Sequence, residues 1–165
     1  MIKKITVISI FLILIFNGCT WTPKSVLPKY FQVIYISPME NLTMEPEIED
    51  ILYRKTKTEF EMDGRLIVTD HVAKANGILF CTITEYKKTP ISYSDKGEID
   101  GNFLQIKVHL KLRDIKTGKW LHDKELTSSI KYYLISEPVE TELEAQKRII
   151  SNLANKIVSK VIEGW

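Results

Sequence analysis

A ten-residue run of strict alternation, from Leu104 to Arg113, constrains the fold of this chain more than any other part of its sequence. Its apolar positions are Leu104, Ile106, Val108, Leu110 and Leu112. Successive side chains of a β-strand point to opposite faces of a sheet, so this run predicts a strand with one buried and one exposed face. The alternate, exposed positions include Lys107, His109, Lys111 and Arg113.

The flanking segments predict further strands and two helices. The strands are expected at residues 31–37, 65–69, 78–86 and 120–134, and the helices at about 43–63 and 140–163. Thr43 is the expected N-cap of the first helix, and Gly64 its expected end. Residues 116–119 predict a hairpin turn. Residues 87–102 predict a long loop, because they are polar and contain Pro90 and two glycines.

This order of elements favours an α+β fold. We expect two helices packed on one face of a mostly antiparallel four- to five-stranded sheet, with the basic strand facing the open side. A chain of 165 residues with 27% charged residues suits one globular domain, which we place at residues 31–165.

The N-terminus predicts export. Lys3 and Lys4 precede an apolar run over residues 5–16, which as a helix would rise only about 18 Å and is too short to cross a bilayer. Gly18-Cys19 directly after this run resembles a bacterial lipobox. We therefore expect residues 1–18 to be a lipoprotein signal peptide, and residues 19–30 to be the lipidated N-terminus and tether. The alternative is a plain secreted protein with a cysteine near its start.

Cleavage before Cys19 would leave a mature chain of balanced charge. Loss of Lys3 and Lys4 leaves 21 basic residues against 21 acidic ones, so an electrostatic function must come from a local pattern. This balance argues against a nucleic-acid partner. With Cys19 acylated, Cys81 has no disulfide partner, and its apolar surroundings predict a buried, inert thiol.

Enzyme motifs are scarce in this sequence. It contains no glycine-rich phosphate loop, no paired-cysteine metal motif and no Gly-x-Ser-x-Gly turn. His71, His109 and His122 share no metal-ligand spacing. We therefore expect no enzyme activity, no metal and no cofactor besides the lipid on Cys19. An unrecognised hydrolase remains a third class, for which no residue stands out as a candidate.

The exposed side of the alternating strand is the predicted binding site. Lys107, His109, Lys111 and Arg113 would lie about 6.5–7 Å apart along one face, with Lys87 and Lys88 at the edge of the predicted loop. Such a ladder of cations can bind phosphate groups. The alternative is an ordinary solvated sheet face, on which lysine discourages pairing between sheet edges.

Several short motifs, in a shared order behind the lipobox, resemble the lipopolysaccharide-assembly lipoprotein LptE family over nearly the whole mature chain. They are Pro38, Asn41-Leu42-Thr43, Glu45-Pro46, Glu59-Phe60, Gly64-Arg65-Leu66, Ala75-Asn76-Gly77, Tyr86, Pro90-Ile91-Ser92-Tyr93, Asp114, Gly118-Lys119, Trp120-Leu121, Leu153-Ala154, Ile157-Val158 and Trp165. The chain departs from the family at Thr20-Trp21, where Gly-Tyr is common, and at Asn76, where aspartate is usual.

This resemblance implies a lipid-anchored protein on the periplasmic side of the outer membrane, and Thr20 after the cysteine agrees with outer-membrane sorting. Such a protein plugs and helps assemble an LptD-type β-barrel translocon, and it assists delivery of lipopolysaccharide to the outer leaflet. The expected partners are the barrel, lipopolysaccharide and the membrane. The strand-helix-strand opening also looks like small domains of Tol and curli-secretion lipoproteins, which implies as an alternative a periplasm-facing interaction module without a lipid ligand.

Overall fold

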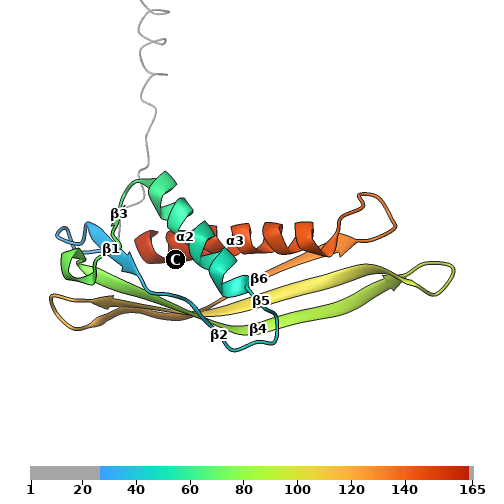
Figure 1. Ribbon diagram of the computed structural model, residues 1–165, viewed down its shortest axis with the longest axis horizontal. Coiled ribbons are helices and arrows are strands. Elements are labelled where there is room, and N and C mark those ends of the chain that lie inside the picture. Colours follow the sequence, from blue (N-terminus) through green and yellow to red (C-terminus); the bar gives the residue numbers. More distant parts are fainter. Residues whose placement is uncertain (1–26, 164–165) are drawn as a thin grey trace, which may run out of the picture.

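Two helices cover one face of an open sheet in the computed structural model, which describes residues 27–163 (Figure 1). The signal segment 1–18, Cys19 and most of the predicted tether lie outside these described residues. The predicted α+β fold, with both helices on the same side of the sheet, is confirmed. No helix within residues 27–163 is long and apolar enough to cross a membrane.

The sheet is mixed, and its long strands are antiparallel. The strands are β1 Val33–Ile36, β2 Glu40–Asn41, β3 Ile67–Val68, β4 Gly77–Tyr93, β5 Ile99–Asp114 and β6 Trp120–Tyr133. Their order is β3-β1-β4-β5-β6, and β2 also pairs with β4. The short strands β1, β2 and β3 make the parallel pairings, whereas β4, β5 and β6 form antiparallel ladders along most of their length.

The predicted loop at residues 87–102 is wrong, because β4 and β5 continue through most of it. Only residues 94–98 turn, at the tip of a hairpin that extends beyond the helices (Figure 1). The ladder includes Lys87 opposite Gln105. Gly101 is a strand glycine and not a turn signal, since a Cβ there would lie 2.4 Å from the Oγ of Ser92 and 2.9 Å from the ring of Tyr133.

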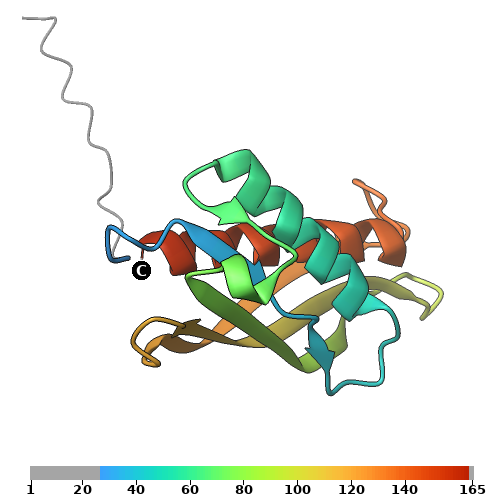
Figure 2. The same ribbon diagram turned by 60° about the vertical axis from the view of Figure 1, so that its left-hand side comes forward.

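Helix α2 spans Ile48–Asp63 and lies across the sheet beside α3 (Figure 2). The predicted N-cap is wrong: Glu47, with φ 64°, precedes the helix, and the Thr43 hydroxyl donates instead to the Asn41 side chain at 2.7 Å. The predicted end is confirmed by Gly64, which has φ 71° and suits a left-handed C-cap.

Helix α3 spans Glu142–Glu163 and begins two residues later than predicted, because Thr141 caps it. The N–H of Glu144 donates to the Thr141 hydroxyl at 3.3 Å, and the N–H of Thr141 donates to the Glu144 carboxylate at 2.9 Å. This reciprocal pair is a capping box. The apolar stripe predicted for this helix is buried, with residues Ile149, Ile150, Leu153, Ile157, Val158 and Val161.

The core lies between the sheet and the helices. The five alternating apolar residues of β5 are all buried, as predicted, together with Leu79, Cys81 and Ile83 of β4. Burial raises the pKa of Cys81 to about 12, so this side chain stays a neutral thiol at ordinary pH.

Strand β6 lies at the edge of the sheet, and α3 covers part of that edge. Lys156 Nζ donates to the carbonyl oxygen of Thr127 at 2.7 Å, and Arg148 Nη2 donates to that of Lys131 at 3.0 Å. Two carbonyl groups of the edge strand are therefore occupied by side chains of the helix.

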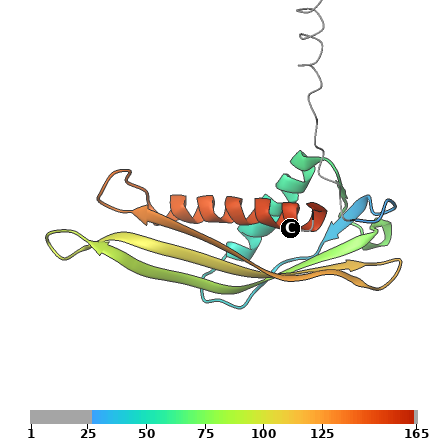
Figure 3. The ribbon, with the colours of Figure 1, turned by 180° about the vertical axis from the view of Figure 1, so that it is seen from behind.

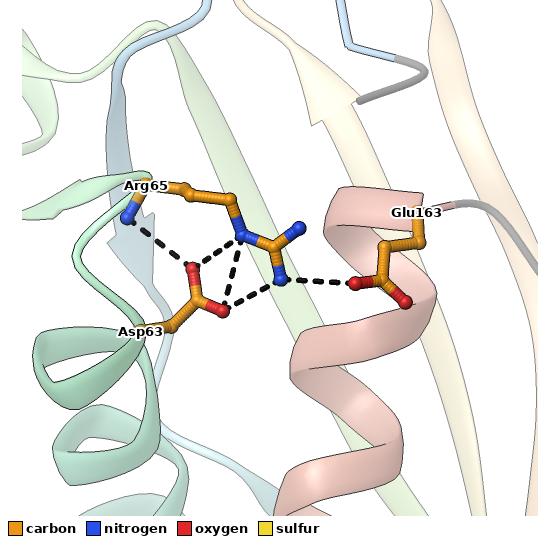
Figure 4. Close-up of polar contacts among 3 residues, drawn as sticks. All are labelled: Asp63, Arg65 and Glu163. Atoms are coloured by element: carbon orange, nitrogen blue, oxygen red, sulfur yellow. Dashed lines mark hydrogen bonds and ion pairs between the residues drawn. The ribbon is translucent and has the colours of Figure 1, made fainter. Parts of the chain in front are cut away.

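Arg65 joins the ends of the two helices (Figure 4). Its Nη2 lies 2.7 Å from Asp63 Oδ2 at the end of α2 and 3.0 Å from Glu163 Oε1 at the end of α3. The hydrogen bond from Arg65 lowers the pKa of Asp63 below its ordinary value, even though partial burial opposes this shift.

Candidate functional site

The face of the sheet opposite the helices is the candidate functional site, and it is uncovered within residues 27–163 (Figure 3). Because the alternate residues of β5 are buried against the helices, Lys107, His109, Lys111 and Arg113 lie on this open face. The structure therefore brings together the four β5 side chains that the alternation predicted.

The other two predicted residues, Lys87 and Lys88, are neighbours in β4 and so face opposite sides of the sheet, and a β-bulge at Thr84 sets which of them faces the helices. Lys87 pairs with Gln105 and lies on the open face, whereas Lys88 pairs with Leu104 and lies on the helix side. There the Nζ of Lys88 is 2.8 Å from Glu142 of α3. The structure thus places Lys87 with the basic strand and Lys88 away from it.

Carboxylates on the neighbouring strands contact three of the four β5 side chains. Lys107 Nζ lies 3.3 Å from Glu85 of β4, while His109 Nε2 lies 2.6 Å and Lys111 Nζ 3.8 Å from Asp123 of β6. The hydrogen bond with His109, aided by the charge of Lys111, lowers the pKa of Asp123. The open face is therefore a mixed, cross-strand-paired surface and not a bare ladder of cations.

Sequence reasoning did not identify these acidic partners as site residues. Their positions follow from the strand register, which sets Glu85 opposite Lys107, and Asp123 opposite Lys111. The hairpin turn at 116–119 could have indicated the second pairing, because it aligns β6 with β5.

An aromatic group lies at the end of the basic strand. The Trp120 ring centroid is 5.8 Å from Arg113 Cζ and 5.7 Å from Lys111 Nζ, and the Phe80 ring meets it edge-on at 6.0 Å. Arg113 has no carboxylate partner within residues 27–163. A hollow of about 330 Å³ lies here, lined in part by Phe80, His109, Lys111 and Trp120.

The chemistry of this face is that of a binding surface. It offers cations, aromatic rings and hydroxyl groups, which suit phosphate, sugar or protein contacts. Within the described part of the chain, no three His, Cys, Asp or Glu side chains are grouped so that they could hold a metal ion.

Two helices on one face of a mixed open sheet, with the other face free, is an architecture shared with small envelope lipoproteins. The chain is similar in fold to the hypothetical protein CT253 from Chlamydia trachomatis, with a TM-score of 0.61 and 14% identity over 81% of this chain and 96% of that one. It is also similar to rare lipoprotein B from Shewanella oneidensis, with a TM-score of 0.52 and 12% identity over 78% and 92%.

A minor lipoprotein from Acinetobacter baumannii has a TM-score of 0.50 and 17% identity over 81% of this chain and 92% of that one. At these identities the likeness shows the fold alone. The sequence matches no protein-family model and no curated protein.

Proposed function

We propose that this protein is an outer-membrane lipoprotein, acylated at Cys19, that lies inside an LptD-type β-barrel translocon. It helps the barrel to assemble and assists delivery of lipopolysaccharide, by binding and without chemical turnover. The fold shared with rare lipoprotein B and the sequence motifs quoted above support this assignment.

The observation that carries the proposal is the character of the open sheet face. The interiors of outer-membrane barrels are polar, and a protein inside one must present a polar surface that does not leave charges unpaired. The ion pair of Lys107 with Glu85 and the hydrogen bond between His109 and Asp123 meet this requirement. An apolar open face would instead favour burial against a helix or a bilayer.

The pairing also indicates where a phosphate would first bind. Lys107 and Lys111 must weaken their contacts with carboxylates before they bind another anion, whereas Arg113 has only the Trp120 ring beside it. We therefore place the first phosphate contact at Arg113.

Affinity purification of the full-length tagged protein from its own membranes, followed by mass spectrometry, tests the barrel partner. A large outer-membrane barrel recovered in about equal amount is the expected result. Recovery of periplasmic proteins without a barrel would contradict the proposal and favour the periplasm-facing interaction module of the Tol or curli-secretion type.

A triple variant tests the open face itself. Replacing Lys107, Lys111 and Arg113 by alanine removes the cations of β5, so lipopolysaccharide binding or barrel recovery should fall while circular dichroism stays unchanged. The matched control replaces three cations of the helices, Arg54, Lys55 and Lys147, by alanine. Equal losses in the two triple variants would show that the open face has no special role.

A further inference from the structure

The end of the domain at which the chain enters the fold carries a cluster of cations. Three segments meet there: residues 27–32 before β1, residues 69–76 between β3 and β4, and the β5–β6 turn at 115–119 (Figure 1). We call these three segments the entry platform. They contain four lysines, Lys29, Lys74, Lys116 and Lys119, against one acidic residue, Asp70, whose carboxylate is bound to Lys57 at 2.8 Å.

Hydrogen bonds join the three segments into one surface. The side-chain oxygen of Asn76 accepts from the N–H of Gln32 at 2.9 Å, and the N–H of Ile115 donates to the carbonyl oxygen of Asn76 at 2.9 Å. The hydroxyl of Tyr30 donates to the carboxylate of Asp114, at the start of the turn. The lysines thus lie on loops that are joined to one another by hydrogen bonds.

These lysines are exposed, and no carboxylate within residues 27–163 forms an ion pair with any of the four. Nearby apolar side chains are exposed as well: Ile67 is 64%, Val72 45% and Ile115 42% exposed. Lys116 Nζ lies 4.6 Å from the centroid of the Tyr30 ring, which leaves its charge free of any carboxylate in the described part of the chain. Cations without carboxylate partners, beside exposed aliphatic groups, are the combination that binds the interface of an anionic lipid layer.

The opposite end of the domain has the reverse charge. The β4–β5 turn at 94–98 and the segment 134–141 contain four acidic residues, Asp95, Glu98, Glu137 and Glu140, against one lysine, Lys96. Of the four, Glu140 is paired with Arg148 of α3 at 2.5 Å, which leaves three acidic residues against the single charge of that lysine. The two ends are separated by strand β4, whose 17 residues span about 56 Å. The domain is therefore electrically polarised along its long axis.

The position of the predicted anchor matches this polarity. Only seven residues lie between Cys19 and Leu27, so the eight Cα–Cα steps of the tether reach at most about 28 Å from the membrane to the entry platform. The platform is accordingly the part of the domain that the anchor holds nearest to the lipid.

We propose that the entry platform binds the anionic headgroups of the lipid layer in which the protein is anchored, and so orients the domain with its acidic end away from the membrane. This inference rests on the lipid anchor of the proposed function and concerns the anchored protein outside the barrel, so it does not depend on the barrel or on lipopolysaccharide binding.

Polarity-sensitive probes on the full acylated protein test this orientation. Because Cys19 carries lipid and Cys81 is buried, an introduced cysteine is the reactive thiol of the described domain. Val72→Cys reports on the entry platform, and Ile91→Cys, at a position 41% exposed on the far half of β4, is the matched control. Each labelled variant is reconstituted in vesicles of phosphatidylcholine with phosphatidylglycerol, and in vesicles of phosphatidylcholine alone.

The probe at Val72→Cys should shift to the blue in the anionic vesicles and lose most of that shift at about 1 M salt, where the screening length is about 3 Å. The probe at Ile91→Cys should not respond. Replacing Lys74, Lys116 and Lys119 by glutamine should abolish the shift, whereas replacing Lys96, Lys131 and Lys147 by glutamine should preserve it.

The outcomes separate this inference from the proposed function. A probe at Val72→Cys that is indifferent to anionic lipid, or two probes that respond alike, would overturn the platform. Failure of the protein to carry lipid on Cys19, seen directly by mass spectrometry, would overturn both the anchor and the platform that rests on it. Absence of a barrel partner would leave the probe result standing.

Discussion

The surrounding residues leave no room for a side chain at Gly77, the first residue of β4. A Cβ at this position would lie 2.2 Å from the Phe31 ring and 2.8 Å from the carbonyl oxygen of Arg113. We expect Gly77→Ala to lower the free energy of unfolding by about 1–3 kcal/mol, because the ring or the strand must shift. Urea denaturation measures the loss, and the exposed Ser129→Ala is the control. An unchanged midpoint for Gly77→Ala would contradict the close approach.

His122 predicts a pH dependence of stability. Partial burial, with the charges of Lys160 and Lys124, lowers its pKa, and the contact with the Val161 carbonyl at 3.3 Å only partly opposes this shift. The unfolded chain, with a histidine pKa of about 6.5, therefore binds a proton first as the pH falls. Stability from this residue is present above that value and is lost as the pH falls toward the lower folded-state pKa.

Urea denaturation of the His122→Gln variant and of the unaltered protein, at pH values between about 5 and about 7, tests this expectation. The variant should show a flatter dependence of the free energy of unfolding on pH than the unaltered protein. Identical slopes would show that His122 titrates alike in the folded and unfolded states.

At the residue scale, the alternation of β5 correctly predicted which side chains face away from the helices. It did not predict their partners, since the contacts with Glu85 and Asp123 depend on strand register and on the bulge at Thr84. A period-two pattern is local, whereas a cross-strand pair joins residues that are distant in the sequence.

At the scale of elements, Arg65 connects α2 to α3 through two carboxylates. Its removal leaves Asp63 and Glu163 close together without a cation, so Arg65→Ala should lower the free energy of unfolding by about 1 kcal/mol. Glu163→Gln removes only the charge of the Glu163 carboxylate, so it should lower the free energy of unfolding by about half as much. Thermal unfolding at low and high salt measures both, and a loss unaffected by salt would argue against an electrostatic origin.

The helices and the buried half of the sheet could be predicted because each buries an apolar stripe with its own period. The far half of the β4–β5 hairpin could not, since its arms extend past the helices and bury little apolar surface. Its strands are held together by backbone hydrogen bonds, which leave no periodic pattern of apolar residues in the sequence. Gly101 lies in a strand, where it allows close packing against Ser92 and Tyr133, and it does not form a turn.

At the scale of the whole molecule, the proposed acylation of Cys19 predicts where the protein resides. Cys19→Ser removes the acylation site, so the protein should leave the outer-membrane fraction and appear among the soluble periplasmic proteins. Membrane fractionation with immunodetection measures the change, and Thr20→Ser is the control that retains the cysteine. Retention of the Cys19→Ser protein in the membrane would show that something other than this lipid holds it there.

The contacts that Lys156 and Arg148 make with the carbonyl groups of Thr127 and Lys131 affect how separate copies of the protein meet. A free edge strand can recruit another strand and begin an ordered aggregate. Here two of the acceptors that a neighbouring strand would need already have donors from the same molecule. Two copies of the protein that meet along this edge therefore have fewer free acceptors with which to pair their strands.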